Sequence, residues 1–267
     1  MDEAGVRAVL FDLQDTLVPS GHPAEHAAVS RGMGADLGVD PGAFAAAVEE
    51  TFDERVRGLM ADVHHTVRYL ARRVGGSPTE SQVESAIARR TNYLLSLHAA
   101  TWALPALKSL RKRGFKLGLV ADCGAETAAI WPQSPLADHL DAVSFSCQTG
   151  VRKPDSGAYL VAAAALKVRT GECVYVGDGA DRELSGAEAV GMRAVRFGAR
   201  ALDEVEQVEA TDAGAAFDLD PEWSGPTISD LGELVGMIGL PIQRDGSESR
   251  TFVSGNVVPW GSKRSSR

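Results

Sequence analysis

The sequence predicts an α/β protein in which a helical domain is inserted into a doubly wound parallel sheet. Short apolar runs of strand length alternate with helical segments from about residue 104 onward, and this alternation favours a parallel sheet covered by helices on both faces. Residues 18–103 show helical periodicity instead, with almost no strand pattern. We therefore assign residues 1–17 and 104–240 to a Rossmann-like core, 18–103 to the helical insert and 241–267 to a disordered tail.

The first half of the chain is expected to hold one strand followed by helices. Residues 6–11 are apolar and end at a carboxylate, Asp12, as a buried strand of a parallel sheet would. Proline is tolerated in the first turn of a helix, so Asp40-Pro41 marks a helix start, while Gly75-Gly76 marks a helix end. The expected helices cover about residues 23–36, from 41 onward, 60–73 and 77–99.

The second half is expected to alternate helices and strands. Strands are expected at 115–121, 141–145, 172–177 and 192–197, helices at 106–113 and 157–166, and a short strand and helix near 226–231. Residues 202–222 form an acidic, loop-like stretch. Asp122 and Asp178 follow strands as Asp12 does, and parallel sheets bind ligands at the carboxyl ends of their strands. We therefore expect one sheet edge to bring these three aspartates together.

Composition limits the class of partner. The chain has 267 residues, of which 44% are hydrophobic and 24% charged, as in an ordinary globular protein with a substantial core. Its formal net charge of −9 argues against nucleic acid or an anionic membrane as the main partner. The chain start does not resemble a signal peptide and no apolar run reaches about 18 residues, so we expect a cytoplasmic protein without a membrane span. Three scattered cysteines favour reduced thiols over a disulfide framework.

Four short segments carry the residues on which the functional prediction depends. They are Asp12-Leu13-Gln14-Asp15-Thr16 at the end of the first strand, Leu119-Val120-Ala121-Asp122, Arg152-Lys153-Pro154, and Val176-Gly177-Asp178-Gly179 followed by Glu183. Each segment alone is typical of a turn, a helix cap or a surface loop. In this order they resemble the four motifs of the haloacid dehalogenase (HAD) superfamily, over about residues 6–200. The helical insert is similar to the cap domain of that superfamily.

The resemblance implies a hydrolase that works through a covalent intermediate on a small phosphorylated substrate. Asp12 would be the nucleophile, because a carboxylate that attacks a phosphoryl group splits one difficult displacement into two easier ones. Lys153 would stabilise the nucleophile and the transferred group as a point charge, and Thr16 would hydrogen-bond near the phosphoryl oxygens. Gln14 and Asp122 occupy the remaining catalytic positions of the first and second motifs.

The same resemblance implies a magnesium site. Mg²⁺ prefers carboxylate and carbonyl oxygens, and it would offset the repulsion between an anionic nucleophile and an anionic substrate. Its ligands would be Asp12, the backbone carbonyl of Gln14 and Asp178. Glu183, which the family pattern favours over Asp181, would hold metal-bound water.

Two positions depart from the pattern of the phosphatases in this superfamily. Gln14 stands where their second acidic residue donates a proton to the leaving group, and an amide cannot give up a proton at neutral pH. General acid–base catalysis is typically worth about 10²–10⁴-fold in rate. Asp15 is the nearest carboxylate, but it occupies the usual glycine position and is expected to point elsewhere. Ala121 replaces the hydroxyl residue that holds the phosphate.

These departures leave several functions open. The leading one is a magnesium-dependent phosphohydrolase for substrates with a good leaving group, such as an acyl phosphate. A 2-haloacid dehalogenase needs neither acid nor metal, but such enzymes typically lack the aspartate that is present here as Asp178. Phosphonate cleavage requires a lysine in the cap, and residues 17–107 contain none. The third possibility is a catalytically silent binding or regulatory protein. The sequence specifies neither the substrate nor the oligomeric state.

Overall fold

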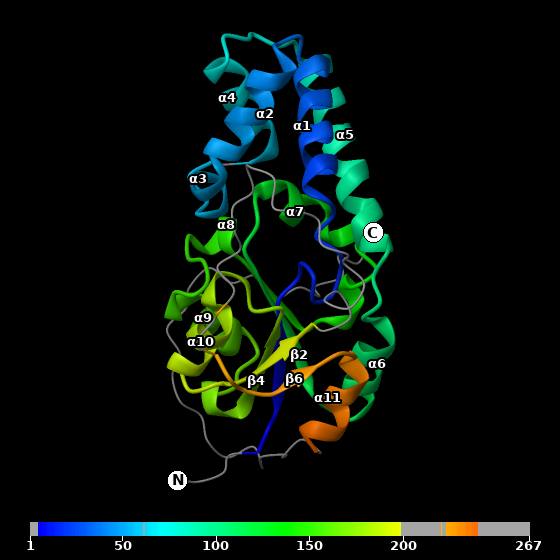
Figure 1. The fold of residues 1–267 in the computed structure, drawn as a ribbon, viewed down its shortest axis with the longest axis vertical. Coiled ribbons are helices and arrows are strands. Elements are labelled where there is room, and N and C mark those ends of the chain that lie inside the picture. The colour runs from blue at the N-terminus through cyan, green and yellow to red at the C-terminus, as the bar shows by residue number, and fades with distance from the viewer. Residues whose placement is uncertain (1–4, 61, 199–219, 221–222, 240–267) are drawn as a thin grey trace, which may run out of the picture.

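The computed structural model describes residues 5–60, 62–198, 220 and 223–239, and its centre is a parallel sheet (Figure 1). The six strands are β1 (Ala8–Phe11), β2 (Lys116–Ala121), β3 (Ala142–Phe145), β4 (Cys173–Gly177), β5 (Arg193–Phe197) and β6 (Thr227–Ile228). They pair in the order β3-β2-β1-β4-β5-β6, and every pairing is parallel. The predicted α/β fold class is therefore confirmed.

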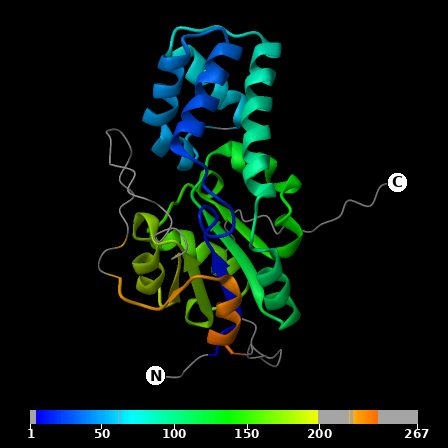
Figure 2. The same ribbon diagram turned by 45° about the vertical axis from the view of Figure 1, so that its right-hand side comes forward.

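Helices cover both faces of the sheet (Figures 1 and 2). Because successive side chains of a strand point to opposite faces, Val9 and Phe11 of β1 join one apolar cluster while Ala8 and Leu10 join another. The first cluster contains side chains of α6 (Leu104–Lys112) and α11 (Leu231–Met237), and the second those of α9 (Ser156–Ala165) and α10 (Glu183–Ala189). Burial on both faces explains why the strands are continuous apolar runs.

Between Pro23 and Ala99 the chain folds into helices that lie above the sheet in Figures 1 and 2. These are α1 (Pro23–Asp36), α2 (Pro41–Glu50), α3 (Phe52–Val56), α4 (Val63–Arg73) and α5 (Glu80–Ala99). Asp40 caps α2 by accepting a hydrogen bond of 2.7 Å from the amide of Ala43. The helices enclose an apolar cluster of their own, which includes Phe44 and Leu70, so this region does not depend on the sheet for its core.

The two crossings between the sheet and the helical insert lie side by side. Thr101, on the returning chain, donates a hydrogen bond of 2.6 Å from its hydroxyl to the carbonyl of Leu17, on the outgoing chain. Trp102 donates one of 3.0 Å from its indole nitrogen to the carbonyl of Thr16. The insert therefore leaves the core and rejoins it next to the loop that follows β1.

The elements that periodicity did not reveal are the short ones. They are α3, α10, α7 (Ala125–Ile130), α8 (Ser146–Thr149), and the 3₁₀ turns η1 (Trp131–Gln133), η2 (Ala137–His139), η3 (Thr170–Glu172) and η4 (Ala180–Arg182). A segment of three to seven residues makes at most two helical turns, too few to display a 3.6-residue pattern. The helix expected from residue 60 begins only at Val63, after the N-cap Asp62.

Two regions of the sequence prediction fall outside the described residues: the acidic stretch 202–222, apart from Asp220, and the tail 241–267. Among the helices that the structure describes, none has the length and apolar character needed to cross a bilayer.

Candidate active site

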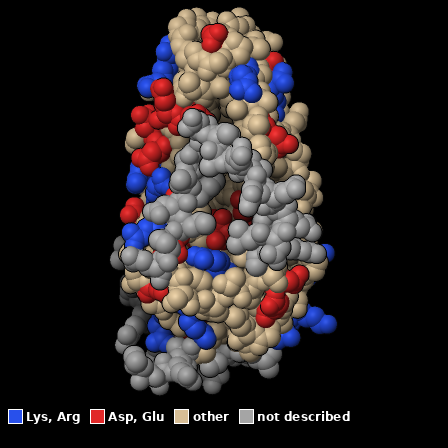
Figure 3. All heavy atoms as spheres, viewed as in Figure 1, with Lys and Arg blue, Asp and Glu red and all other residues tan. Residues whose placement is uncertain are grey.

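Three carboxylates converge at the carboxyl edge of the sheet. Asp12 follows β1 and Asp178 follows β4, and these strands are neighbours, while Glu183 begins α10. Oxygen atoms of the three side chains all lie within 4.8 Å of one another. In Figure 3, acidic atoms are visible in a hollow between the helical insert above and the sheet below. The structure thus brings together three of the four residues predicted for the metal site, either as ligands or as a holder of metal-bound water.

Lys153 is the cation within this cluster. Its ammonium group donates hydrogen bonds to Asp12 Oδ1 and, at 2.6 Å, to Glu183 Oε2, and its side chain is only 6% exposed. Burial by itself would lower the pKa of Lys153, but the carboxylates of Asp12, Glu183 and Asp122 raise it well above its usual value. Burial raises the pKa of Asp12, and Lys153 opposes that shift. The ion pair therefore offsets part of the effect of burial, although the pKa of Asp12 stays well above its usual value.

Glu183 is fixed by more partners than any other member of the cluster. Besides Lys153, Tyr175 donates a hydrogen bond of 2.6 Å to Oε2, and the amide of Gly179 donates one of 3.0 Å to Oε1. A Cβ at Gly177 would collide with this carboxylate, which explains why β4 ends in glycine. Burial would raise the pKa of Glu183, but Lys153 and these hydrogen bonds lower it. Glu183 is therefore an oriented carboxylate.

Asp178 is the carboxylate of the cluster that makes no hydrogen bond with Lys153 among the described contacts. Its carboxylate accepts a hydrogen bond of 3.0 Å from the amide of Ala180, while Lys153 bonds to Asp12 and Glu183 instead. Burial and the nearby charge of Glu183 raise the pKa of Asp178 to about 7. Three carboxylates around one ammonium leave an excess of hard oxygen donors, and this donor set fits a divalent cation such as Mg²⁺.

Asp122 and Asp181 lie beside the cluster without joining it. The backbone amide of Lys153 donates hydrogen bonds of 3.1 and 3.2 Å to the two oxygens of Asp122, so Asp122 holds the loop that carries the lysine. Asp181 is 44% exposed and accepts a hydrogen bond of 2.6 Å from Arg152. Of the two acidic residues considered for metal-bound water, only Glu183 faces the other carboxylates.

The loop after β1 places its three polar residues in different environments. Thr16 is fully buried, and its hydroxyl has no hydrogen-bond partner among the described residues, so it is free to bind a ligand oxygen. Gln14 is partly exposed and pairs through its backbone with Val18. Asp15 has a left-handed backbone with φ of 52°, which explains the usual glycine there. Its side chain is exposed and accepts a hydrogen bond of 2.9 Å from the amide of Ser20.

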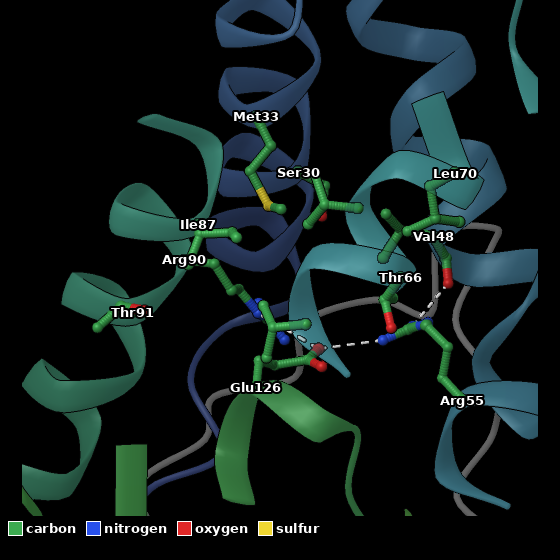
Figure 4. Close-up of a pocket in the computed structure, with 12 residues that line it drawn as sticks. Ser30, Met33, Val48, Arg55, Thr66, Leu70, Ile87, Arg90, Thr91 and Glu126 are labelled. Atoms are coloured by element: carbon green, nitrogen blue, oxygen red, sulfur yellow. Dashed lines mark hydrogen bonds and ion pairs between the residues drawn. The ribbon is translucent and has the colours of Figure 1, made fainter. Parts of the chain in front are cut away.

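An ion-pair network joins the helical insert to the core (Figure 4). Arg55 of α3 donates a hydrogen bond of 3.1 Å to Glu126 of α7 and one of 2.7 Å to the carbonyl of Val48. These side chains close a cavity of about 30 Å³ between α1, α2, α4 and α5. That volume holds roughly two water molecules, so the cavity is too small for a substrate.

The sequence prediction missed several residues of this region. Tyr175 is part of an apolar strand, and the only indication of its role is that a buried phenol needs a hydrogen-bond partner. Arg55 and Glu126 resemble ordinary surface charges in the sequence, and Arg152 lies in the third motif segment without an assigned role. Their partners lie far away along the chain, so no local pattern could have identified them.

Comparison with known proteins establishes the family. The model of the haloacid dehalogenase-like hydrolases matches residues 6–191, and the chain belongs to that family. It is therefore a hydrolase, and the superfamily predicted from the four motifs is confirmed.

Several relatives are phosphatases. The chain is 31% identical over 202 residues to the glyceraldehyde 3-phosphate phosphatase of Methanopyrus kandleri, covering 72% of this chain and 84% of that protein. It is 29% identical over 240 residues to the ribulose-1,5-bisphosphate 5-phosphatase of Halopiger xanaduensis, covering 85% and 98%.

Solved structures share the fold at lower sequence identity. A HAD phosphatase from Thermococcus onnurineus aligns with a TM-score of 0.57 at 21% identity, covering 89% of this chain and all of that one. A 2-haloacid dehalogenase from Pseudomonas syringae aligns with a TM-score of 0.60 at 22% identity, covering 86% and 96%. Because the fold serves both chemistries, the choice between them depends on the site residues.

Proposed function

We propose that this chain is a cytoplasmic, magnesium-dependent phosphohydrolase that acts on a small phosphorylated sugar or related metabolite, with Asp12 as the nucleophile. The observation that carries the proposal is the buried Asp12–Lys153 ion pair inside the cluster with Asp178 and Glu183. The substrate class follows from the relatives, whose names specify glyceraldehyde 3-phosphate and ribulose 1,5-bisphosphate as their substrates.

In the proposed reaction, the Asp12 carboxylate attacks the phosphorus atom and the bond to the leaving oxygen breaks. The resulting aspartyl phosphate is then hydrolysed by water. Lys153, already bonded to Asp12, stabilises the negative charge of the transferred group. Thr16, whose buried hydroxyl has no partner among the described residues, donates a hydrogen bond to a phosphoryl oxygen.

The metal site of this proposal uses Asp12, the backbone carbonyl of Gln14 and Asp178 as ligands. Mg²⁺ would neutralise part of the charge on nucleophile and substrate when bound. Both oxygens of Glu183 already accept hydrogen bonds from protein groups. We therefore assign Glu183 to holding and orienting metal-bound water.

The weak point of the proposed site is the missing acid. Gln14 cannot supply a proton, and Asp15 does not replace it, because its exposed carboxylate is bonded to the amide of Ser20. The proposal therefore favours substrates whose leaving group departs without protonation, such as acyl phosphates.

We further propose that residues 18–103 act as a cap that covers this site and selects the substrate. Three contacts support this role: Arg55 with Glu126, Asp53 with Arg152, and Gly58 with the backbone of Cys147. All three join the insert to segments at the carboxyl edge of the sheet, where the candidate nucleophile lies.

A second candidate is a binding protein without catalytic activity, and Gln14 together with Ala121 is the specific reason to consider it. A 2-haloacid dehalogenase is less favoured, because Asp178 provides a metal donor that such an enzyme does not need. The phosphohydrolase would consume phosphorylated compounds, the dehalogenase would consume 2-haloacids, and the binding protein would consume neither.

The experiment is a hydrolysis screen of sugar phosphates, acyl phosphates and 2-haloacids, with and without Mg²⁺. The Asp12→Asn variant serves as the blank. We expect phosphate release that requires both Mg²⁺ and Asp12, and calorimetry should show Mg²⁺ binding that Asp178→Ala abolishes. Halide release without metal would establish the dehalogenase instead. Mg²⁺ binding without turnover of any substrate would establish the silent protein.

A further inference from the structure

We propose that Cys123 and Cys147 form a reversible disulfide when the protein meets hydrogen peroxide, which makes this pair a redox modification site beside the catalytic loop. The two residues are 24 positions apart in the chain; Cys123 directly follows the segment that ends at Asp122, and Cys147 lies in α8. The proposal rests on the register of two strands and on hydrogen bonds just beyond their ends, and formation of the bond is independent of the proposed function.

The sheet brings the chain close to itself just before the two cysteines. β2 and β3 are parallel neighbours whose last pair is Ala121 with Phe145; Cys123 lies two residues beyond β2, and Cys147 lies two residues beyond β3 in the short helix α8. Neighbouring strands lie about 4.8 Å apart, and disulfides join Cα atoms at about 4.4–6.8 Å. The spacing of the sheet therefore suits a disulfide, provided that the chains stay together beyond the strand ends.

Ser146 keeps the chains together at that point. Its hydroxyl accepts a hydrogen bond of 3.0 Å from the amide of Cys123 and donates one of 3.4 Å to the carbonyl of the same residue. Both thiols are free in this structure, and each lies near enough to shift the pKa of the other. The two residues are thus neighbours before any oxidation.

The environments of the two thiols differ in a way that assigns their roles. Cys123 is buried, while Cys147 is partly exposed and can meet a small oxidant. The interaction with Cys147, together with burial, raises the pKa of the Cys123 thiol well above its usual value, whereas the interaction with Cys123 lowers the pKa of the Cys147 thiol. Since the thiolate is the reactive form, Cys147 is the residue that peroxide oxidises first.

The chemistry balances with one molecule of peroxide. The Cys147 thiolate attacks one oxygen of hydrogen peroxide, the O–O bond breaks, and the departing hydroxide takes up a proton to give water and a sulfenic acid on Cys147. The Cys123 sulfur then attacks the Cys147 sulfur, the S–O bond breaks, and the leaving hydroxide takes the Cys123 proton as a second water. Two thiols supply the two electrons that reduce the peroxide.

A bond at this position links two structural features of the site. Cys123 directly follows Asp122, whose carboxylate holds the backbone of Lys153. The carbonyl of Cys147 lies so close to Gly58 of the insert that any side chain there would collide with it. We expect oxidation to slow hydrolysis reversibly by altering both contacts, and this last expectation alone rests on the proposed function.

The test uses the full-length reduced protein, treated with hydrogen peroxide and then alkylated. Intact mass before alkylation should fall by two hydrogens, digestion should yield one peptide pair joined through Cys123 and Cys147, and dithiothreitol should reverse both changes. Cys173 is the internal control, because it is buried in β4 and burial raises the pKa of its thiol to about 12. The Cys173→Ala variant should form the same disulfide as the wild type.

The Cys123→Ser variant removes the resolving thiol while leaving Cys147 exposed. Dimedone, which traps sulfenic acids, should then label Cys147 more than about tenfold over Cys173. Circular dichroism of the reduced variants checks that they are folded. Absence of a bond between Cys123 and Cys147 in folded wild type, or equal labelling of Cys173, would overturn the proposal. A disulfide that forms with no change in phosphate release would retain the modification site and remove its effect on activity.

Discussion

The ion pairs of the core and those of the helical insert differ in how far water reaches them. In the core, Lys153 and its partners Asp12 and Glu183 are at most 6% exposed. In the insert, Arg89 pairs with Asp36 at 2.6 Å although the arginine side chain is 47% exposed. Buried charges depend on each other for stability, whereas exposed ones are screened and worth little.

The difference has a consequence for how each region tolerates change. The core cluster is fixed by Tyr175 and the amide of Gly179, so its members cannot be replaced independently. The insert touches the core through side chains such as Asp53, which is 61% exposed. We therefore expect substitutions in the core cluster to have large effects and those at this exposed insert contact to have small ones.

The largest effect is expected for Lys153→Met. Removing the ammonium group leaves Asp12 and Glu183 as buried carboxylates without a cation, so the free energy of unfolding should fall by about 3–5 kcal/mol. Urea denaturation without added metal measures this change in the free energy of unfolding. The matched control is Arg89→Met in the exposed pair of the insert, which should cost less than about 1 kcal/mol. Equal losses in the two variants would contradict the comparison.

The next effect concerns His98, at the end of α5 where the insert returns to the core. Burial lowers the pKa of His98 to about 4, and its ring is hydrogen-bonded to Ser134 at 2.8 Å. Between pH 6.5 and 4 the unfolded chain therefore binds a proton that the folded chain does not. The contribution of the neutral His98 to the free energy of unfolding is fully present above pH 6.5. It should be lost, by about 3 kcal/mol, as the pH drops towards 4.

The variant His98→Gln keeps a hydrogen-bonding side chain that does not titrate. Denaturation curves of both proteins at matched pH values isolate the histidine, because carboxylates that titrate in the same range contribute to both. The difference in the free energy of unfolding between wild type and His98→Gln should change by about 3 kcal/mol between pH 6.5 and 4. A constant difference would mean that His98 is not the titrating group.

The third variant, Gln14→Asp, should gain activity. The expected change in the reaction barrier is smaller than the changes in stability described above. The new carboxyl group can protonate a poor leaving group, so hydrolysis of alkyl phosphates should rise by up to about 10²-fold, while acyl phosphates gain little. Gln14→Asn is the control, because it matches aspartate in size and has no acidic proton. A gain of equal size for every leaving group would point to an effect on the metal or the fold.

The smallest effect is expected for Asp53→Asn at the contact between insert and core. Asp53 accepts hydrogen bonds of 3.1 Å from Arg152 and 3.0 Å from Arg57, but its exposure to solvent limits the loss in the free energy of unfolding to less than about 1 kcal/mol. The KM for substrate should rise more than kcat changes if this contact keeps the insert over the site. A loss above 3 kcal/mol would place the contact among the buried pairs.

The sequence was most informative where chemistry lies at a strand end. Asp12 and Asp178 could be assigned to one sheet edge because each follows an apolar run of strand length, and β1 and β4 are neighbours in the structure. The position of Asp15 could also be anticipated, since its glycine-like backbone directs its side chain to solvent. The catalytic and metal-binding roles of these residues stay predictions.

The rest depended on which elements pack together. Tyr175 reaches Glu183 only because α10 begins beneath the end of β4, and Arg152 reaches Asp53 only because α3 lies above the core. Such pairs join segments separated by up to 99 positions, and a charge or a phenol gives no local indication of its partner. Helix α3 escaped prediction as well, because its five residues are too few to show a period.

The hydrogen bonds from Thr101 to Leu17 and from Trp102 to Thr16 have an evolutionary consequence. They hold the two ends of the insert together, so replacing it requires only a short link and leaves the order of the strands unchanged. Recombination at this one place would give the scaffold a different set of substrate contacts, while Asp12, a few residues upstream, would keep its position on the sheet. The same join is where a laboratory chimera should be cut.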